Sequence, residues 1–258
     1  TNDIEYYFRL FTYDSSDNLN NSLTGQQITA TPGINLGPGP TTLQGGDTSA
    51  GYYGTVSSSN FITGDTLASD LGITQGTSIN STTDWLKFSL DDKVVFVPKK
   101  PIRSEISWDH LYEAGAVYGD GLIEGETGAE HHNTGGNGGT LTATRQDAQV
   151  TIDGNTYTVR LFKGADEDPT NSYDDADNGS IGPGNEWNKL MLPIHTNAPD
   201  SWAYSAYVNN PTEDWGIGFT DSDLVTDSDY RDGSYSWCQE TKDTDTVRRV
   251  PRGGTGVS

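Results

Sequence analysis

The sequence predicts an α+β fold that is rich in β-structure and in loops. Hydrophobic residues make up 32% of the 258 residues, which is too small a share for a helical bundle. The 31 glycines supply turns, while 13 tyrosines and 6 tryptophans supply large side chains for a lean core. This aromatic content also argues against a disordered chain.

An apolar strand is predicted near the N-terminus, over residues 4–13. Its alternate positions are β-branched or aromatic on both faces, so the strand needs partners on both. Residues 14–50 offer few apolar groups and form either a long irregular connector or short strands completed by another chain. We favour the second interpretation, which assigns a set of residues to oligomer contacts: Ile4, Tyr6, Tyr7, Phe8, Leu10 and Phe11.

From residue 52 onward the sequence contains segments with the patterns of regular secondary structure. Residues 53–56 are typical of a short strand. Residues 61–72 predict a short helix, with Asp65 as its N-terminal cap and Gly72 at its end.

A hairpin and a second helix follow. Residues 85–98 alternate as two strands that turn at Asp91 and Asp92, the clearest hairpin in the chain. The clearest helix begins after the cap Ser107 and stops at Gly115.

Residues 119–140 are polar and rich in glycine, and they contain His131 and His132. Adjacent side chains in an extended loop point apart, so the pair is a poor chelate and we expect a solvated loop. A second hairpin is predicted over residues 149–161, because Asp153 and Gly154 separate two alternating segments.

The last third of the chain carries one predicted helix, over residues 185–192, and is otherwise rich in loops. Trp202, Trp215 and Trp237 are expected along short strands, where with Trp187 they would build a compact core.

The net charge of −22 excludes several classes of partner. Such a chain repels phosphate backbones and anionic membrane surfaces, so we expect neither nucleic-acid binding nor membrane insertion. No apolar run approaches the length of a membrane span, and no signal peptide is evident at the N-terminus. The single cysteine, Cys238, precludes an intrachain disulfide and a multi-cysteine metal site.

The acidity has three open interpretations. Its 37 carboxylates are mostly Asp and concentrate after residue 100. They form a solvated face, an adaptation to high salt, or a calcium site, for which Asp227, Asp229 and Asp232 are the candidate ligands. We expect no other cofactor.

No catalytic constellation stands out. The chain lacks a Gly-x-Ser-x-Gly elbow and a phosphate-binding loop. His110 lies in a predicted helix and His195 in an apolar stretch, where structural roles are expected. The sequence therefore predicts that the protein is not an enzyme.

An ordered series of motifs resembles a module found in virion proteins of tailed viruses, typically head or tail fibre components. The series covers the chain from near Tyr53 to its end. It comprises Tyr53-Gly54-Thr55-Val56, Phe61-Ile62-Thr63-Gly64-Asp65, Trp85-Leu86-Lys87-Phe88, Val97-Pro98-Lys99-Lys100-Pro101-Ile102-Arg103, Ile106-Ser107-Trp108-Asp109, Gly115-Ala116-Val117-Tyr118-Gly119, Tyr157-x-Val159-Arg160-Leu161, Gly184-Asn185-Glu186-Trp187-Asn188, Ser236-Trp237-Cys238-Gln239-Glu240 and Arg252-Gly253-Gly254.

The end of this series is also similar to the closing pattern of formylglycine-generating enzymes, which have a variant of the C-type lectin fold. The resemblance rests on the segment around Trp187, on Trp237 and on the final Arg-Gly-Gly. The enzyme activity does not carry over, because its copper site needs two cysteines and only Cys238 is present. Both families continue beyond this segment, so either the chain is shortened at Ser258 or its last strand comes from elsewhere.

These resemblances imply a virion structural protein that is assembled in the host cytoplasm and displayed on the virion surface. Residues 1–52 would attach or oligomerise, and residues 53–258, with a sub-boundary near 100, would form the displayed lectin-like module. The expected partners are further copies of the chain in a trimer, other virion proteins and a host-surface glycan. The candidate glycan contacts are Trp202, Tyr204, Tyr207, Asp214 and Trp215. The alternatives are a glycan-active hydrolase of the virion and a cellular surface adhesin.

Overall fold

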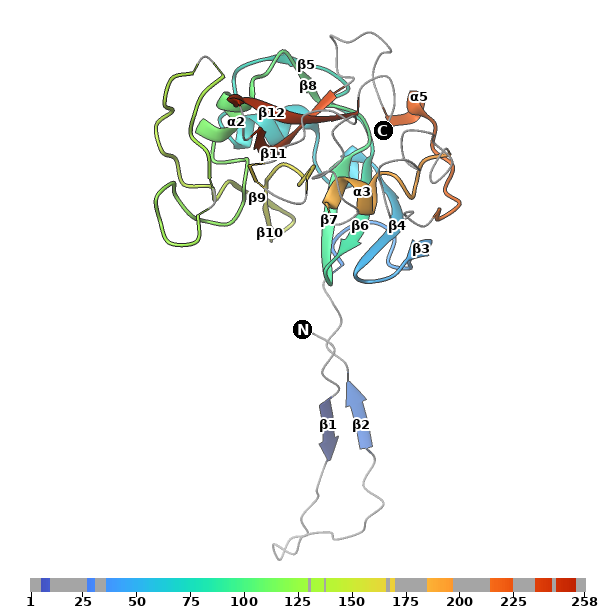
Figure 1. Cartoon of the computed structure of the whole chain (residues 1–258). Coiled ribbons are helices and arrows are strands. Elements are labelled where there is room, and N and C mark those ends of the chain that lie inside the picture. Colours follow the sequence, from blue (N-terminus) through green and yellow to red (C-terminus); the bar gives the residue numbers. More distant parts are fainter. Residues whose placement is uncertain are drawn as a thin grey trace, which may run out of the picture. The chain divides into compact units, whose positions relative to one another are not determined.

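A computed structural model describes two short stretches near the N-terminus and most of the chain from residue 36 onward. The described residues are 6–9, 27–30, 36–129, 131–136, 138–165, 168–169, 185–196, 214–224, 235–242 and 245–253. They form a β-rich α+β structure with four α-helices and several small antiparallel sheets, as predicted (Figure 1). The chain divides into two compact units, Thr1–Gly37 and Pro38–Ser258. The boundary predicted after residue 52 falls inside a strand of the second unit.

The described residues of the first unit include one antiparallel pair of short strands. Strand β1 (Tyr6–Arg9) pairs with β2 (Gln27–Ala30), with Tyr6 opposite Ala30 and Arg9 opposite Gln27. The strand predicted over residues 4–13 is thus described over four residues. Strand β2 lies in the segment expected either as a connector or as short strands completed by another chain. It pairs with β1 of its own chain, and contacts with another chain stay a prediction.

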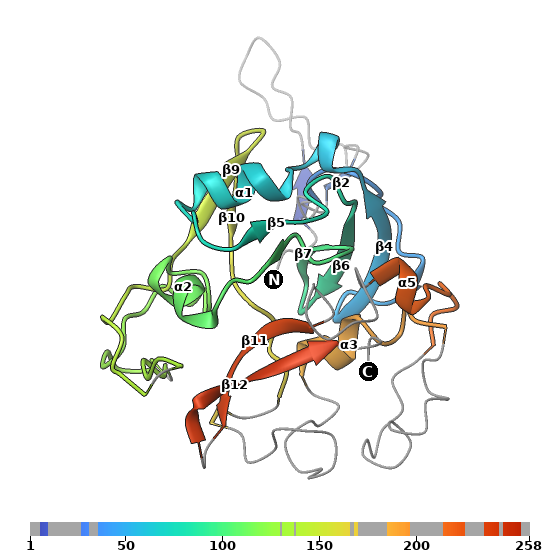
Figure 2. The same ribbon diagram turned by 90° about the horizontal axis from the view of Figure 1, so that it is seen from above.

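The second unit is built on a four-stranded antiparallel sheet with the order β3–β4–β6–β7. Figure 2 shows β4, β6 and β7 of this sheet from above. Its strands are β3 (Gly45–Gly46), β4 (Ala50–Val56), β6 (Trp85–Leu90) and β7 (Lys93–Pro98). The predicted hairpin of β6 and β7 is confirmed. Asp91 and Asp92 both take left-handed backbone angles, with φ of 48° and 60°, which suit the tight turn between two twisted strands.

Two apolar clusters pack around this sheet. One joins the sheet residues Tyr52, Leu86 and Phe88 to Trp187 and Leu190 of helix α3 (Glu186–Leu190). The other joins Val56, Ile62 and Trp85 to Val150 and Ile152. The last two lie in the second predicted hairpin, formed by β9 (Gln149–Ile152) and β10 (Asn155–Thr158), which is also confirmed.

Local capping chemistry explains the helices. Helix α1 (Gly64–Asp70) is capped by Thr63, whose side chain accepts from the amide of Thr66. The prediction of Asp65 as the cap is wrong, because Thr63 has the extended backbone that a cap needs while Asp65 already lies in the first turn.

The predicted cap and stop of the second helix are confirmed. Ser107 caps α2 (Trp108–Glu113), and Gly115 follows it with a φ of 72°. The predicted helix after the cap Asn185 is α3. Two further short helices lie in the described ranges, a 3-10 turn η1 (Ser58–Asn60) and α5 (Asp221–Leu224). None of the helices in the described ranges is long and apolar enough to cross a membrane.

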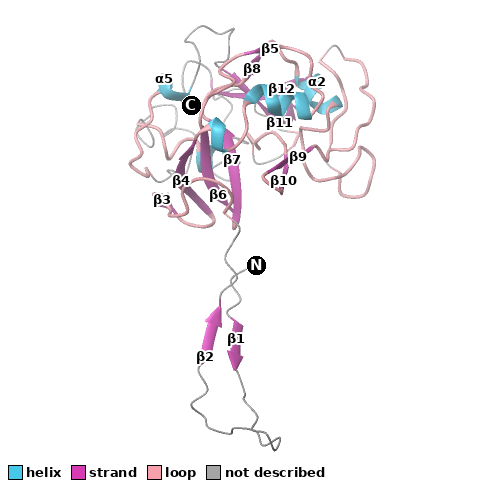
Figure 3. Ribbon diagram, turned by 180° about the vertical axis from the view of Figure 1, so that it is seen from behind, coloured by secondary structure: helices cyan, strands magenta, loops and turns pink. Residues whose placement is uncertain are grey.

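Two further strand pairs lie near α2, as Figure 3 shows from behind. They are β5 (Thr77–Ser78) with β8 (Arg103–Ser104), and β11 (Tyr235–Lys242) with β12 (Asp245–Gly253).

The tryptophans of the last third depart in part from prediction. Trp237 lies in a strand, β11, but is 37% exposed and does not belong to the core. Trp215 lies in a loop rather than a strand and packs, half-buried, against the first apolar cluster. Trp202 is outside the described residues.

Candidate functional site

A long loop between α2 and β9 is held to the body of the second unit by buried side chains. We call residues 116–148 the pinned loop. Gln146, which is fully buried, accepts from the amide of Val117 at 3.0 Å and donates to the carbonyl of Tyr112 at 3.0 Å. The backbone closes at its base, where the amide of Ala148 donates to Gly115. Loops of this length without regular structure are uncommon in compact domains and are often functional.

Four aromatic rings hold the loop against α2. Trp108 and Tyr112 are one helical turn apart and stack at 5.3 Å. Tyr118 of the loop meets both rings edge-on, at 6.2 and 6.4 Å. The imidazole of His131 stacks on Tyr118 at 4.2 Å. We call Trp108, Tyr112, Tyr118 and His131 the aromatic cluster.

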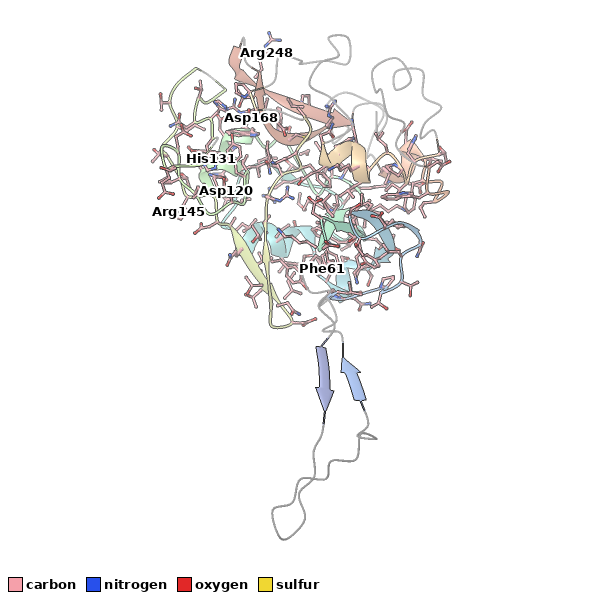
Figure 4. The ribbon with its side chains drawn as sticks, turned by 60° about the horizontal axis from the view of Figure 1, so that its bottom comes forward. Phe61, Asp120, His131, Arg145, Asp168 and Arg248 are labelled. Carbon is pink, nitrogen blue, oxygen red and sulfur yellow. The ribbon has the colours of Figure 1, made fainter. Side chains whose placement is uncertain are left out.

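His131 is buried, which corrects the expectation of a solvated loop at this position. Its side chain is 1% exposed, and its Nε2 lies 2.7 Å from Oδ2 of Asp120 (Figure 4). The stacked ring of Tyr118 covers one face of the imidazole. A sequence pattern could not show this, because both partners come from elsewhere in the loop.

The neighbouring His132 faces a different partner. Its Nε2 lies 3.6 Å from Oδ1 of Asp168, and its backbone amide donates to the hydroxyl of Tyr118 at 3.1 Å. Burial, together with the charge of Asp168, raises the pKa of Tyr118, so this phenol stays neutral. The two histidines thus have separate partners, as adjacent positions in an extended segment predict.

Arg249 of β12 joins the hairpin β11–β12 to the aromatic cluster. Its guanidinium lies 3.9 Å from the ring centroid of Trp108. It donates to the hydroxyl of Thr241 at 3.2 Å and to the carbonyl of Thr134 in the pinned loop. Burial lowers the pKa of Arg249, but an arginine starts so high that it keeps its charge. The preceding residue, Arg248, is exposed (Figure 4).

Two carboxylates join this hairpin to other segments of the second unit, Asp168 and Glu240 of β11. Asp168 accepts from the amide of Thr241 at 2.8 Å, and Glu240 accepts from the amide of Gly164 at 2.9 Å. Burial raises the pKa of Glu240 to about 7, against amide hydrogen bonds that favour its charged form. Arg252 donates to the carbonyl of the same Gly164 at 2.9 Å.

The buried cysteine of β11 adds no reactive thiol to this arrangement. Burial raises the pKa of the Cys238 thiol, which therefore stays protonated and is a poor nucleophile. Within the described ranges no group of three His, Cys, Asp or Glu residues could hold a metal ion. The hydrogen bonds of Gln146 and Arg249 and the stacking of His131 on Tyr118 hold the pinned loop to the rest of the second unit.

The predicted glycan contacts are described only in part. Trp202, Tyr204 and Tyr207 lie outside the described residues. Asp214 is exposed, and its Oδ1 accepts from the amide of Gly216 at 2.7 Å. Trp215 packs closely on Gly45. A Cβ atom added at Gly45 would lie 2.4 Å from the Cβ of Trp215. A glycan role for Asp214 and Trp215 stays a prediction.

The other predicted sites are mostly beyond the described part. Asp227, Asp229 and Asp232, the candidate calcium ligands, are outside it, as are Ile4, Leu10 and Phe11 of the oligomerisation set. Tyr6, Tyr7 and Phe8 lie in β1.

The histidines outside the pinned loop have structural partners, as expected. His110 lies in α2 and its Nδ1 is 2.9 Å from the hydroxyl of the cap Ser107. His195 is buried, with Nε2 2.9 Å from a carboxylate oxygen of Asp221.

No family model, no curated protein and no solved structure matches the chain. The functional argument therefore depends on the chain's own residues.

Proposed function

We propose that the protein is a non-catalytic structural protein of a tailed virus, displayed on the head or tail of the virion. In this proposal the first unit attaches or oligomerises, as a trimer. The second unit is a lectin-like module that presents the pinned loop outward for decoration or for adhesion to a host-surface glycan.

The first unit carries the proposal. Its described structure is a single pair of four-residue strands, and an isolated two-stranded hairpin is at best marginally stable in water. The sequence around β1 is nevertheless strongly apolar, and includes Tyr6, Tyr7 and Phe8. Among the described residues the outer edges of this apolar pair have no further strand partner, and such an edge is a template for strands from other chains, as an attachment segment would need.

The second unit supports the display role. The pinned loop is fixed from beneath by the aromatic cluster, by Gln146 and by Arg249. An exposed ion pair between Arg145 and Glu126, at 2.9 Å, adds a further tie within the loop. A rigid body that carries a long surface loop is the usual architecture of recognition surfaces.

Sedimentation of the full chain tests the attachment role. We expect a trimer at micromolar concentration for the native chain, and a monomer with unchanged near-ultraviolet circular dichroism for Phe8→Asp. The matched control is Thr42→Asp, which adds the same charge at an exposed position of the second unit and should remain trimeric. A native chain that sediments as a stable monomer would contradict the proposal.

Labelling of purified virus particles with an antibody to the second unit tests location. We expect labels on the head or on the tail. If purified, infectious particles contain none of this chain, the virion role is overturned.

A further inference from the structure

Trp237 is the one large apolar side chain that is exposed within the described ranges, at 37%. Its neighbour in β11, Cys238, is fully buried, so the two alternate between the faces of the hairpin. Opposite Trp237 in β12 lies Pro251, which is half-buried. The indole Nε1 donates to the carbonyl of Ile106 at 2.9 Å. The ring is therefore fixed at one edge while part of its surface faces water.

The residue before Ile106 has an unusual backbone. Glu105 has a φ of 54°, in the left-handed region. The other non-glycine residues that share this conformation among those described are Asn80, Asp91, Asp92 and Asp153, types that tolerate it in turns. The short side chains of Asn and Asp can hydrogen-bond to their own backbone in this conformation, whereas the longer side chain of a glutamate does not offset its cost in this way. A backbone outlier of this kind suggests a functional constraint.

The side chain of Glu105 is exposed and oriented. Its Oε2 accepts from the hydroxyl of Thr77 at 2.7 Å, across the β5–β8 pair. The segment from Glu105 to Ile106 thus presents a fixed carboxylate and, one residue later, the carbonyl that fixes the indole of Trp237.

We infer that Trp237 and Glu105 form a binding site for a neutral pyranose. An indole offers a flat apolar surface for the C–H face of a sugar ring, and a carboxylate accepts hydrogen bonds from sugar hydroxyls. The net charge of −22 disfavours an anionic sugar at this surface. Both groups are held before binding, so little side-chain freedom is lost on association.

This inference deepens the adhesion part of the proposed function and rests on it. It differs from the sequence-based candidates, which place the glycan at Trp202, Trp215 and their neighbours.

The six indole N–H signals of the full chain provide a direct test by nuclear magnetic resonance. Trp237→Phe assigns the signal of Trp237. Maltotriose, cellotriose, chitotriose and laminaritriose are titrated as neutral probes, and sialyllactose as an anionic one. We expect at least one neutral trisaccharide to shift the Trp237 signal saturably, and sialyllactose to leave it unmoved.

Two variants measure how much Trp237 and Glu105 each contribute to the affinity for the trisaccharide. Trp237→Ala should weaken binding about tenfold, and Glu105→Gln, which keeps an oxygen for Thr77, about threefold or more. Glu113→Gln is the matched control, since it makes the same change at another exposed glutamate, in α2, and it should bind as the native chain does. Thermal melting of each variant verifies that it is folded, and Glu105→Gln remains decisive if Trp237→Ala does not fold.

The contrary outcomes are distinct. No shift of Trp237 with any probe at 20 mM overturns the site, as does a response of Trp202 or Trp215 in its place. Loss of the trimer in Trp237→Ala would make this surface a contact between copies and would also overturn it. In each case antibody labelling of particles still decides the virion role separately.

Discussion

The ammonium of Lys87 lies 2.6 Å from the carbonyl oxygen of Pro40, although Lys87 is in the middle of a buried strand. A second carbonyl, that of Pro38, accepts from it at 2.9 Å. The rings of Tyr53 and Phe96 lie within 6 Å of the same ammonium, at 5.3 and 5.8 Å. Lys87 thus fastens the start of the second unit to the centre of its sheet.

We expect Lys87→Met to lower the free energy of unfolding of the second unit by about 2 kcal/mol, because it leaves the two proline carbonyls without their donor. Urea unfolding, followed by tryptophan fluorescence, measures the change. Lys93→Met is the matched control: Lys93 lies at the exposed start of β7, so its loss should change stability by less than about 0.5 kcal/mol. Equal effects of the two variants would refute the fastening role.

Glu240 predicts a pH dependence with a definite sign. Burial raises its pKa from 4.5 to about 7, so between these values the folded chain keeps a proton that the unfolded chain releases. The contribution of Glu240 to stability is therefore complete below about pH 4.5 and is lost as the pH rises through about 7. The difference corresponds to about 3 kcal/mol over the whole window.

Glu240→Gln removes this titration and keeps an acceptor for the amide of Gly164. We measure the free energy of unfolding with urea from pH 4 to 8. As the pH rises, we expect the free energy of unfolding of this variant to increase relative to that of the native chain. Glu113→Gln, at an exposed position of α2, should follow the native profile. Parallel profiles for Glu240→Gln and the native chain would show that Glu240 titrates normally.

Salt should stabilise the second unit. Residues 38–258 carry 33 Asp and Glu against 14 Lys and Arg, so their mutual repulsion is large at low ionic strength. Raising NaCl from 0.1 to 1 M shortens the screening length from about 10 Å to about 3 Å. We expect the melting temperature to rise at pH 7, and to respond much less near pH 4.2, where the net charge approaches zero. A melting temperature that falls with NaCl at pH 7 would contradict this.

Local signals in the sequence explain how much of the fold could be predicted. The turn at Asp91 and Asp92, the cap Ser107 and the stop Gly115 depend on residues a few positions apart, and each prediction is confirmed. Such signals act through the backbone of their own segment, so they need no knowledge of the rest of the fold.

Features that depend on distant partners were missed. The alternation of apolar and polar residues in β6 places Lys87 on the polar face of the strand. All six residues of β6 are nevertheless buried, because residues 38–40 cover that face. His131 was expected in solvent and is buried on Tyr118. Trp237 was expected in the core and is exposed. In each case the deciding contact joins segments that pattern alone does not bring together.

Arg248 and Arg249 provide a matched pair for testing the link between β12 and the pinned loop. Arg249 is buried over the indole of Trp108, while Arg248 is exposed. A lysine keeps the charge at either position but lacks the planar fork that stacks and donates in two directions. We expect Arg249→Lys to lower the free energy of unfolding by about 1–3 kcal/mol and Arg248→Lys by less than about 0.5 kcal/mol.

The region in which hydrogen exchange accelerates in Arg249→Lys distinguishes a specific loss of the contact between β12 and the pinned loop from general destabilisation. Since Arg249 donates to the carbonyl of Thr134, its loss should speed amide hydrogen exchange in residues 131–136 more than in β6. The near-ultraviolet circular dichroism of the stacked Trp108 should also weaken. Uniform acceleration of exchange across the second unit would mean that Arg249 stabilises the fold as a whole and does not specifically fix the loop.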